Sequence, residues 1–373
     1  MKSIDLQFEV KEAILACGAD LKGAFAIAQG YKAWLFDGFG DLAELDNFTR
    51  YEKSIKANLK KLKIGPEIIA YDMHPGYFST QFAKDFLQQI PGSEPCEVQH
   101  HEAHIASAIV DCGIKGGCIG VSFDGTGYGH DGNIWGGEFF VGDLKNFKRA
   151  GHFEYVAMPG GEKAISEPWR MAASFLYKAL AKSKSSSSLT SKVGKVKEWQ
   201  TLKEMIDKNI NSPLTSSAGR LFDAVGSIVL SKDRAAFEAE LPIELEKLAI
   251  ELCQDRYDFD VRSEKNILNI SFSRTLLEII KDLKGKVGKA TISSKFHNTV
   301  AAAILDICGR LRKKYKMNKV VLSGGVFQNK FLTTRATMLL KHSGFDVYTH
   351  SRISTNDSGI PIGQIAIARA RCV

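Results

Sequence analysis

The chain has 373 residues, of which 44% are hydrophobic and 25% are charged. These proportions are globular averages, so they exclude a disordered, collagen-like or coiled-coil chain. A chain of this length rarely forms a single core, and we expect two packed lobes. No apolar run reaches the roughly 18 residues that a membrane-spanning helix needs, so we expect no membrane partner.

The seven cysteines are scattered along the chain and include no Cys-x-x-Cys pair. This pattern is typical of reduced thiols and argues against both a disulfide framework and a zinc finger. The first six residues include Asp5, whereas a secretory signal would be apolar there. We therefore expect a cytoplasmic protein.

The net charge of +8 raises the question of a nucleic-acid partner. Much of the excess is local, because basic residues concentrate at 178–197, around a serine run, and at 310–319. The first stretch is typical of a surface loop, and the second ends a predicted helix, where cations complement the helix dipole. The sequence has no recognisable nucleic-acid-binding motif, so we expect no direct nucleic-acid partner.

The predicted elements follow one order twice. In the first copy, three closely spaced β-like runs precede a helix, a strand and a helix, at residues 13–17, 24–29, 32–36, 44–62, 67–72 and 77–89. In the second copy, three β-like runs precede helices and a strand–helix–strand unit, at residues 118–123, 133–141, 147–155, 168–181, 219–229, 297–314, 320–323, 329–341 and 345–349. A duplicated three-strand meander with appended αβ units predicts the two-lobed α/β fold of the actin/Hsp70/sugar-kinase (ASKHA) superfamily.

We place the boundary between the two lobes at residue 115. The N-terminal lobe, residues 1–115, then carries the histidine-rich motif described next. The C-terminal lobe, residues 116–373, contains a helical insert and the basic, serine-rich loop at about 178–200.

A histidine-rich motif follows a short predicted strand and opens a helix at residue 100. His100 and His104 are four residues apart and so share one helix face, a spacing at which two imidazoles reach one metal ion. His101 points about 100° away from His100, and we expect it not to be a ligand. Surface or capping histidines are the alternative, but three histidines within five residues favour a ligand pair.

Two aspartates are placed to complete such a site. Asp124 ends a predicted buried strand, and Asp357 precedes the apolar stretch 360–368. The alternatives are a turn residue for Asp124 and a helix N-cap for Asp357. Two imidazoles and two carboxylates suit zinc, iron or manganese, and the donor types do not choose among these metals.

Two glycine-rich turns also follow predicted buried strands. The first is Gly125-Thr126-Gly127, and the second is Gly324-Gly325. Such turns let backbone N–H groups approach a phosphate closely. Together they predict a nucleotide cleft of a type other than the Walker A or Rossmann sites, whose motifs the sequence lacks.

Several blocks of sequence resemble the signature motifs of the hydrogenase maturation carbamoyltransferase HypF. The blocks are residues 72–80, 98–107, 123–139, 158–161, 167–171, 219–225, 296–297, 324–329 and 356–359. The resemblance runs from about residue 13 to residue 370 and is to the carboxy-terminal half of HypF. That half is related to the TsaD-type tRNA-modification proteins and to antibiotic carbamoyltransferases.

The resemblance implies a specific reaction. In HypF, a YrdC-like domain forms carbamoyl adenylate from carbamoyl phosphate and ATP. The TsaD-like part then moves the carbamoyl group onto the C-terminal cysteine thiol of HypE, on the way to the cyanide ligands of the nickel–iron centre. The implied partners are a HypE-like acceptor and a YrdC-like domain acting in trans. The implied cofactors are a divalent metal, iron or zinc, and ATP/ADP or carbamoyl adenylate.

The resemblance also assigns roles to residues by position. His100, His104, Asp124 and Asp357 match the metal ligands, and the two histidines and Lys22 match catalytic positions, Lys22 near the acceptor end of the site. The residues that match the nucleotide cleft are Gly125, Thr126, Gly127, Gly219, Asp223, Gly324, Gly325 and Asn329, with Gly219 and Asp223 near the ribose.

The sequence departs from the family pattern at several positions. The acylphosphatase, zinc-finger and YrdC-like regions of a full-length HypF have no counterpart in these 373 residues. Glu102 stands where the family has a third histidine, and Asp20 stands where it has glutamate. Ala239, beside Glu238, replaces a glycine, and we expect its Cβ to restrict the approach of backbone to a ligand.

Three functions remain open from the sequence. The resemblance favours carbamoyl transfer to a protein thiol. A second function is O-carbamoylation of a small metabolite or a tRNA threonylcarbamoyl-type reaction, which Glu102 favours and Ala103 and the long glycine block oppose. A third is a non-catalytic scaffold subunit, which the altered segment around Glu238 keeps open.

Overall fold

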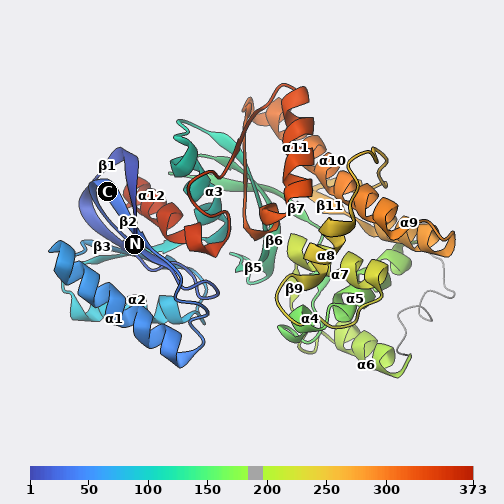
Figure 1. Cartoon of the computed structure of the whole chain (residues 1–373), viewed down its shortest axis with the longest axis horizontal. Helices are drawn as coiled ribbons and strands as arrows, with labels where there is room; N and C mark the ends of the chain where they lie inside the picture. Colours follow the sequence, from blue (N-terminus) through green and yellow to red (C-terminus); the bar gives the residue numbers. More distant parts are fainter. Residues whose placement is uncertain (184–195, 373) are drawn as a thin grey trace.

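The computed structural model describes residues 1–183 and 196–372, which form two lobes, each built around a β-sheet (Figure 1). Within these ranges, no helix combines the length and the apolar character needed to cross a bilayer. About half of the predicted serine-rich loop at 178–200, residues 184–195, lies outside the described residues. The part of it that is described belongs to the helices on either side, which end at Ser183 and begin at Val196.

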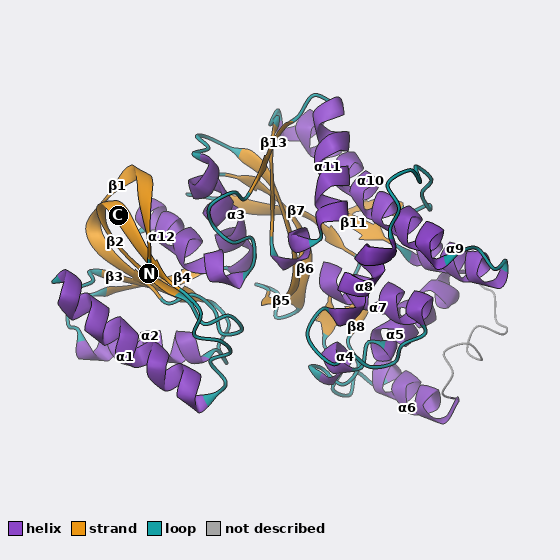
Figure 2. Cartoon of the chain, in the orientation of Figure 1, coloured by secondary structure: helices purple, strands orange, loops and turns teal. Residues whose placement is uncertain are grey.

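The first lobe contains a sheet with the strand order β2-β1-β3-β4. Its elements in chain order are β1 (Lys2–Ala16), β2 (Phe25–Phe36), α1 (Leu45–Leu62), β3 (Ile68–Asp72), α2 (Phe78–Gln89), β4 (Glu94–Val98) and α3 (His100–Cys112). Alternate strand residues face opposite sides of the sheet, so that Leu15 packs against α1 and α2 while Ile14 packs on the other side. That other side is covered by the C-terminal helix, α12 (Ile360–Arg371), and α3 packs against α12 in turn (Figure 2).

The second lobe contains a larger sheet with the order β10-β11-β7-β6-β5-β12-β13. Its strands are β5 (Cys118–Tyr128), β6 (Ile134–Gly142), β7 (Phe147–Phe153), β8 (Val156–Ala157), β9 (Leu214–Thr215), β10 (Asp260–Glu264), β11 (Ile267–Ser271), β12 (Lys319–Ser323) and β13 (Asp346–Thr349). Its α-helices are α4 (Lys163–Ser166), α5 (Trp169–Ser183), α6 (Val196–Asp207), α7 (Ala218–Leu230), α8 (Glu240–Leu248), α9 (Ser273–Lys284), α10 (Lys289–Tyr315) and α11 (Lys330–His342). Two short 3-10 helices, η2 (Gly325–Gln328) and η3 (Asp357–Gly359), follow β12 and precede α12.

Helix α3 lies between the two sheets. Every residue of α3 except its last, Cys112, is buried. Gly120 of β5 allows this close packing, because a Cβ there would lie 2.4 Å from Cδ1 of Ile105 on α3. On its other side α3 packs against α12, which the predicted boundary at residue 115 had assigned to the second lobe. The helix that carries the histidine motif is therefore fixed from both sides by core packing.

The first lobe differs in detail from the predicted three-strand meander. The runs 24–29 and 32–36 are two parts of β2, and β1 begins at Lys2, opposite Leu35. Gly30, at φ +60°, lies at a register shift opposite Val10 and interrupts the strand pattern without ending the strand. Three predicted runs thus correspond to two long strands, because a bulge glycine resembles a turn in sequence.

The two lobes nevertheless repeat one topology. In the first, β1 pairs antiparallel with β2 and parallel with β3, which pairs parallel with β4. In the second, β5 pairs antiparallel with β6 and parallel with β12, which pairs parallel with β13, and β6–β7 completes the predicted meander. This duplicated arrangement is the predicted ASKHA fold.

Candidate metal centre and adjoining cleft

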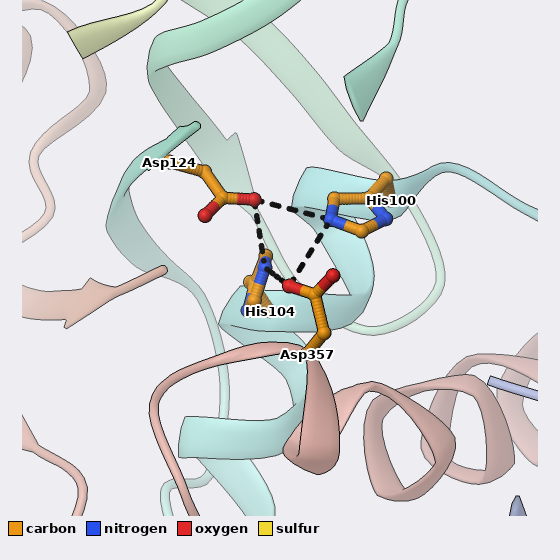
Figure 3. A group of neighbouring side chains, drawn as sticks. All are labelled: His100, His104, Asp124 and Asp357. Atoms are coloured by element: carbon orange, nitrogen blue, oxygen red, sulfur yellow. Dashed lines mark hydrogen bonds and ion pairs between the residues drawn. The ribbon is translucent and has the colours of Figure 1, made fainter. Parts of the chain in front are cut away.

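Four buried side chains meet between the lobes (Figure 3): His100 and His104 from α3, Asp124 from β5 and Asp357 from η3. One possible ligand atom from each lies within 4.8 Å of those from the others. The Nε2 atoms of His100 and His104 are each 3.2 Å from Oδ2 of Asp124, and they are 3.8 and 3.5 Å from Oδ1 of Asp357. The structure thus brings together the four residues that the sequence predicts as one site.

The start of α3 places the two histidines. The side-chain oxygen of Gln99 accepts hydrogen bonds from the backbone N–H groups of His101 and Glu102, at 2.7 and 3.0 Å, and so caps the helix. His101 lies outside the cluster, with its Nδ1 3.1 Å from the side-chain nitrogen of Gln99. Burial lowers the pKa of His101 to about 3, so its ring is neutral. This agrees with the expectation that His101 is not a ligand.

The two aspartates are held by different local structures. Oδ1 of Asp124 accepts a hydrogen bond from the backbone N–H of Gly325, at 3.0 Å, which leaves Oδ2 directed at the histidines. Asn356, one residue before Asp357, provides the cap of η3 by accepting from the N–H of Ser358. The alternative role of Asp357 as an N-cap therefore belongs to Asn356, and the carboxylate of Asp357 faces the cluster.

Opposite charges offset the cost of burying this cluster. Burial by itself would lower the pKa of His100, but the carboxylates of Asp72 and Asp124 hold that pKa well above its usual value. Burial likewise opposes a charge on His104, and Asp124 raises its pKa. Burial alone would raise the pKa of Asp124, but the two histidines hold that pKa well below its usual range.

The donor set fits a divalent metal. Two imidazole nitrogens and two carboxylate oxygens converge on one point from three separate elements, and they are the donors that zinc, iron and manganese accept in proteins. Metal ligands must be deprotonated, so a metal ion that binds here displaces any proton on the imidazole nitrogens that face the carboxylates.

A cavity of about 400 Å³ adjoins the cluster, and Asp124 and Asp357 form part of its wall. Its remaining walls come from the last part of β5, from α7 and α8, from η2 and from the loop between β1 and β2. The predicted turn at 125–127 is therefore part of β5, at a register shift against β6. Five of the predicted cleft residues line it: Gly125, Thr126, Gly219, Gly325 and Asn329. The structure therefore places part of both glycine-rich segments and the metal cluster around one space.

Three predicted cleft residues, Gly127, Gly324 and Asp223, do not line the cavity. A Cβ at Gly127 would lie 2.5 Å from the ring of His101, so this glycine allows α3 to pack. Gly324 has φ +102°, and a Cβ there would lie 2.3 Å from the carbonyl oxygen of Phe123. Asp223 is buried, which raises its pKa, and its carboxylate lies 2.7 Å from Nε of Arg220. Arg220 itself lines the cavity, a contact that no pattern in the sequence indicated.

The opening of the cavity is exposed. Lys22, from the loop after β1, lies 3.3 Å from Glu238, and the two side chains are 43% and 48% exposed. Both residues line the cavity, as does Ala239, which begins α8 in the left-handed region at φ +61°. The substitution of alanine for the family's glycine therefore falls on the cavity wall, at a backbone conformation that favours glycine.

The other two departures from the family pattern do not contact the cluster. Glu102 accepts a hydrogen bond from Arg371 of α12 at 2.6 Å, so it joins α3 to α12. Asp20 accepts hydrogen bonds from the backbone N–H groups of Phe78 and Ser79 and so caps α2. Neither departure changes the four candidate ligands.

Comparisons with known proteins place the chain in a family. Residues 9–111 match the HypF Kae1-like domain, and residues 120–364 match the second subdomain of the carbamoyltransferase Kae1-like domain. A protein of Cupriavidus necator named carbamoyltransferase HypF homolog is 30% identical to this chain, over 95% of this chain and 91% of that protein. The chain belongs to the HypF family.

Other HypF proteins are about twice as long. The probable carbamoyltransferase HypF of Methanocaldococcus jannaschii is 30% identical over 94% of this chain but only 45% of its own length. A crystal structure of full-length HypF in a phosphate- and nucleotide-bound form superposes with a TM-score of 0.91 and 38% identity, over 98% of this chain and 47% of that one. The chain therefore spans about half the length of these HypF relatives, and the resemblance seen in the sequence is confirmed.

Proposed function

We propose that this HypF-family chain transfers a carbamoyl group from carbamoyl adenylate to the C-terminal cysteine thiol of a HypE-like protein, in the maturation of nickel–iron hydrogenase. The observation that carries the proposal is the shared wall: Asp124 and Asp357 belong both to the metal cluster and to the cavity that the glycine turns line. A nucleotide in the cavity would therefore lie beside the cluster. The relatives named carbamoyltransferase HypF support this choice of reaction.

The proposed reaction exchanges one bond to the carbamoyl carbon. The thiolate sulfur of the acceptor attacks that carbon, a carbon–sulfur bond forms, the carbon–oxygen bond to the adenylate phosphate breaks, and AMP leaves. All seven cysteines of the chain lie within the described residues and none lines the cavity, so the acceptor supplies the thiol.

The residues of the cleft take the following parts. His100, His104, Asp124 and Asp357 would hold a divalent metal, whose positive charge, when bound, neutralises charge that builds up during acyl transfer. A ligand can approach the backbone at Gly125, because a Cβ there would meet no atom within 4 Å. Lys22 places a positive charge at the opening of the cavity, where it would stabilise the thiolate of an approaching acceptor.

The formation of carbamoyl adenylate belongs, in this proposal, to a YrdC-like domain acting in trans. The two Kae1-like matches account for residues 9–111 and 120–364 of the 373, and the HypF relatives contain roughly as many residues again. Carbamoyl phosphate and ATP added to this chain alone should therefore give no pyrophosphate above background.

The test combines this chain, a HypE-like acceptor, carbamoyl phosphate and ATP, with and without an added YrdC-like domain. We expect pyrophosphate release and a carbamoylated acceptor only when the domain is present, and an acceptor whose C-terminal cysteine is replaced by serine should stay unmodified. Pyrophosphate release by the chain alone would contradict activation in trans. An unmodified acceptor in the complete mixture would contradict the thiol as the target and would favour a small hydroxylated metabolite, a tRNA or a scaffold role.

A further inference from the structure

A buried carboxylate lies behind the first histidine of the cluster. Asp72, the last residue of β3, has no exposed side-chain surface, and its Oδ2 is 2.7 Å from Nδ1 of His100. This nitrogen is the ring atom opposite Nε2, which faces Asp124 and Asp357 (Figure 3). The ring of His100 therefore contacts Asp72 through Nδ1 and the other cluster residues through Nε2.

Asp72 is itself held in place at two points. Its Oδ1 accepts a hydrogen bond from the backbone N–H of His74 at 2.9 Å, and its backbone carbonyl accepts one from the hydroxyl of Thr80 at 2.8 Å. With Oδ1 occupied by His74, Oδ2 is the atom left for His100. These two hydrogen bonds orient the Asp72 carboxylate, so the direction of the His100 ring is set by the end of β3.

We infer that Asp72 is a positioning residue for the metal site, which fixes the tautomer and the direction of His100. An ionised carboxylate only accepts hydrogen bonds, so Nδ1 of His100 must carry the proton. The lone pair of a neutral ring then lies on Nε2, the atom that faces the cluster, as a metal ligand requires. The inference rests on the metal site of the proposed function and explains why the block 72–80 accompanies the histidine motif in this chain.

An amide at position 72 would favour the opposite tautomer of His100. In Asp72→Asn, the side-chain oxygen can still accept from the N–H of His74, but the amide nitrogen then faces Nδ1 of His100 and donates to it. That hydrogen bond favours the tautomer with its proton on Nε2, which has no lone pair for a metal. The opposite amide orientation instead sets two donors, the amide and the N–H of His74, against each other.

The test measures zinc affinity by competition with a chelator, for the whole chain after metal removal. Asp72→Asn should bind zinc about 10–100-fold more weakly than the unmodified chain, the usual cost of losing a partner behind a metal-binding histidine. Asp72→Ser removes the carboxylate without adding a donor amide against Nδ1, so its loss should be smaller. The expected order of affinity is the unmodified chain, then Asp72→Ser, then Asp72→Asn.

A spectroscopic readout separates positioning from a general loss of stability. Nitrogen NMR of the zinc-loaded chain, with labelled histidine, should show a protonated Nδ1 and a metal-bound Nε2 for His100, and Asp72→Asn should lose this pattern. The matched control is Glu67→Gln, just before the other end of β3. The Glu67 carboxylate accepts a hydrogen bond from the N–H of Ala13 at 3.0 Å, away from the cluster. This control should keep both the zinc affinity and the His100 signals.

The outcomes distinguish the inference from the proposal beneath it. If the unmodified chain binds no zinc, the metal site fails and the role of Asp72 fails with it. If the unmodified chain binds zinc but Asp72→Asn binds within twofold of it with unchanged His100 signals, only the role of Asp72 is overturned. If Asp72→Asn binds as tightly as Asp72→Ser, or more tightly, the tautomer argument is overturned. Should Asp72→Asn fail to fold, an undiminished affinity in Asp72→Ser overturns the inference by itself.

Discussion

The inner end of the cleft and its opening are built in opposite ways. At the inner end, the side chains of His100, His104, Asp124 and Asp357 are at most 11% exposed, and each is fixed by a capped helix, a strand end or a backbone hydrogen bond. At the opening, Lys22 and Glu238 are nearly half exposed and meet in one ion pair, a contact that usually contributes about 0–1 kcal/mol. The inner end is thus determined by the core, whereas the opening is free to change with the ligand or acceptor.

The departures from the family pattern follow this division. Ala239 replaces a glycine at the opening, while Glu102 and Asp20 face α12 and α2 rather than the cluster. Substitutions at the inner end should therefore abolish binding, whereas those at the opening should shift affinity by smaller factors.

The largest effect should come from His104→Ala. It removes one of two imidazoles from the cluster, and we expect a loss of metal affinity greater than the ~10–100-fold seen when only the partner of a ligand is removed. The fold should survive, because α3 keeps its Gln99 cap and its packing between the sheets. Metal analysis after reconstitution should find close to one equivalent in the unmodified chain and almost none in the variant. A full equivalent in His104→Ala would show that the cluster is not the metal site.

The next largest effect should be on nucleotide binding. ADP at a hundredfold excess over its Kd should stabilise the unmodified chain by about 2.7 kcal/mol, seen as a higher Tm. Gly125→Val should remove this shift, because its side chain would project into the open space of the cavity without disturbing the fold.

Gly65→Val is the matched control for this prediction. A Cβ at Gly65 would also meet no atom within 4 Å, and Gly65 does not line the cavity. The control should keep the full ADP shift. An equal shift in Gly125→Val and Gly65→Val would place the nucleotide elsewhere.

The sequence predicts some residues of the site more directly than others. The four-residue spacing of His100 and His104 is local, and a helix converts it directly into one shared face. Asp124 joins them because β5 lies beside α3. Asp357 lies more than 250 residues after His104, and its approach to the histidines depends on the tertiary fold. The sequence supported this residue only by its position before an apolar stretch and by the family resemblance.

Packing that no local pattern reveals explains why some predicted cleft residues do not line the cavity. Gly127 and Gly324 look like ligand-binding glycines in sequence, but their missing side chains make room for His101 and for the Phe123 backbone. Asp72 is the last residue of a buried strand, and this was the signal for its role. Asp124 is predicted to end a strand as well, but β5 continues past it to Tyr128. The sequence did not show that the end of β3 lies beside the start of α3, where Asp72 reaches His100.

A smaller effect, on stability, is expected from Asp111→Asn. Asp111 is buried near the end of α3 and accepts hydrogen bonds from the backbone N–H groups of Ser351, Arg352 and Ile353, which lead towards Asp357. Burial acts to raise the pKa of Asp111, but His350 and these N–H groups lower it well below the usual value. The variant should lose about 1–3 kcal/mol at neutral pH.

The pH dependence of this loss has a defined sign. A depressed carboxyl pKa contributes stability that is fully present above the unfolded-state value of about 3.8 and is lost as the pH falls through the lower folded-state value. The difference between Asp111→Asn and the unmodified chain in urea unfolding should therefore shrink below about pH 4. A difference that stays constant down to the acid limit would contradict the charged hydrogen-bond network.

The smallest effect should come from Ala239→Gly. Glycine relieves the left-handed strain of about 1–2 kcal/mol at φ +61°, but its extra unfolded-state freedom costs about 0.5–1 kcal/mol. The Tm should therefore change little, while ADP binds a few-fold more tightly to the less obstructed wall. Unchanged ADP affinity would show that the Cβ of Ala239 does not limit the cavity.

The central claim is that the metal cluster and the cavity form one site, and the binding of ADP with and without zinc tests it most directly. Titration calorimetry should show ADP binding more tightly to the zinc-loaded chain, by a factor in the range of about 5–150. Zinc should bind more tightly to the ADP-loaded chain by the same factor, because coupling between two sites is reciprocal. Identical ADP affinities with and without zinc, in a chain that binds both, would contradict the claim that Asp124 and Asp357 join the two into one site.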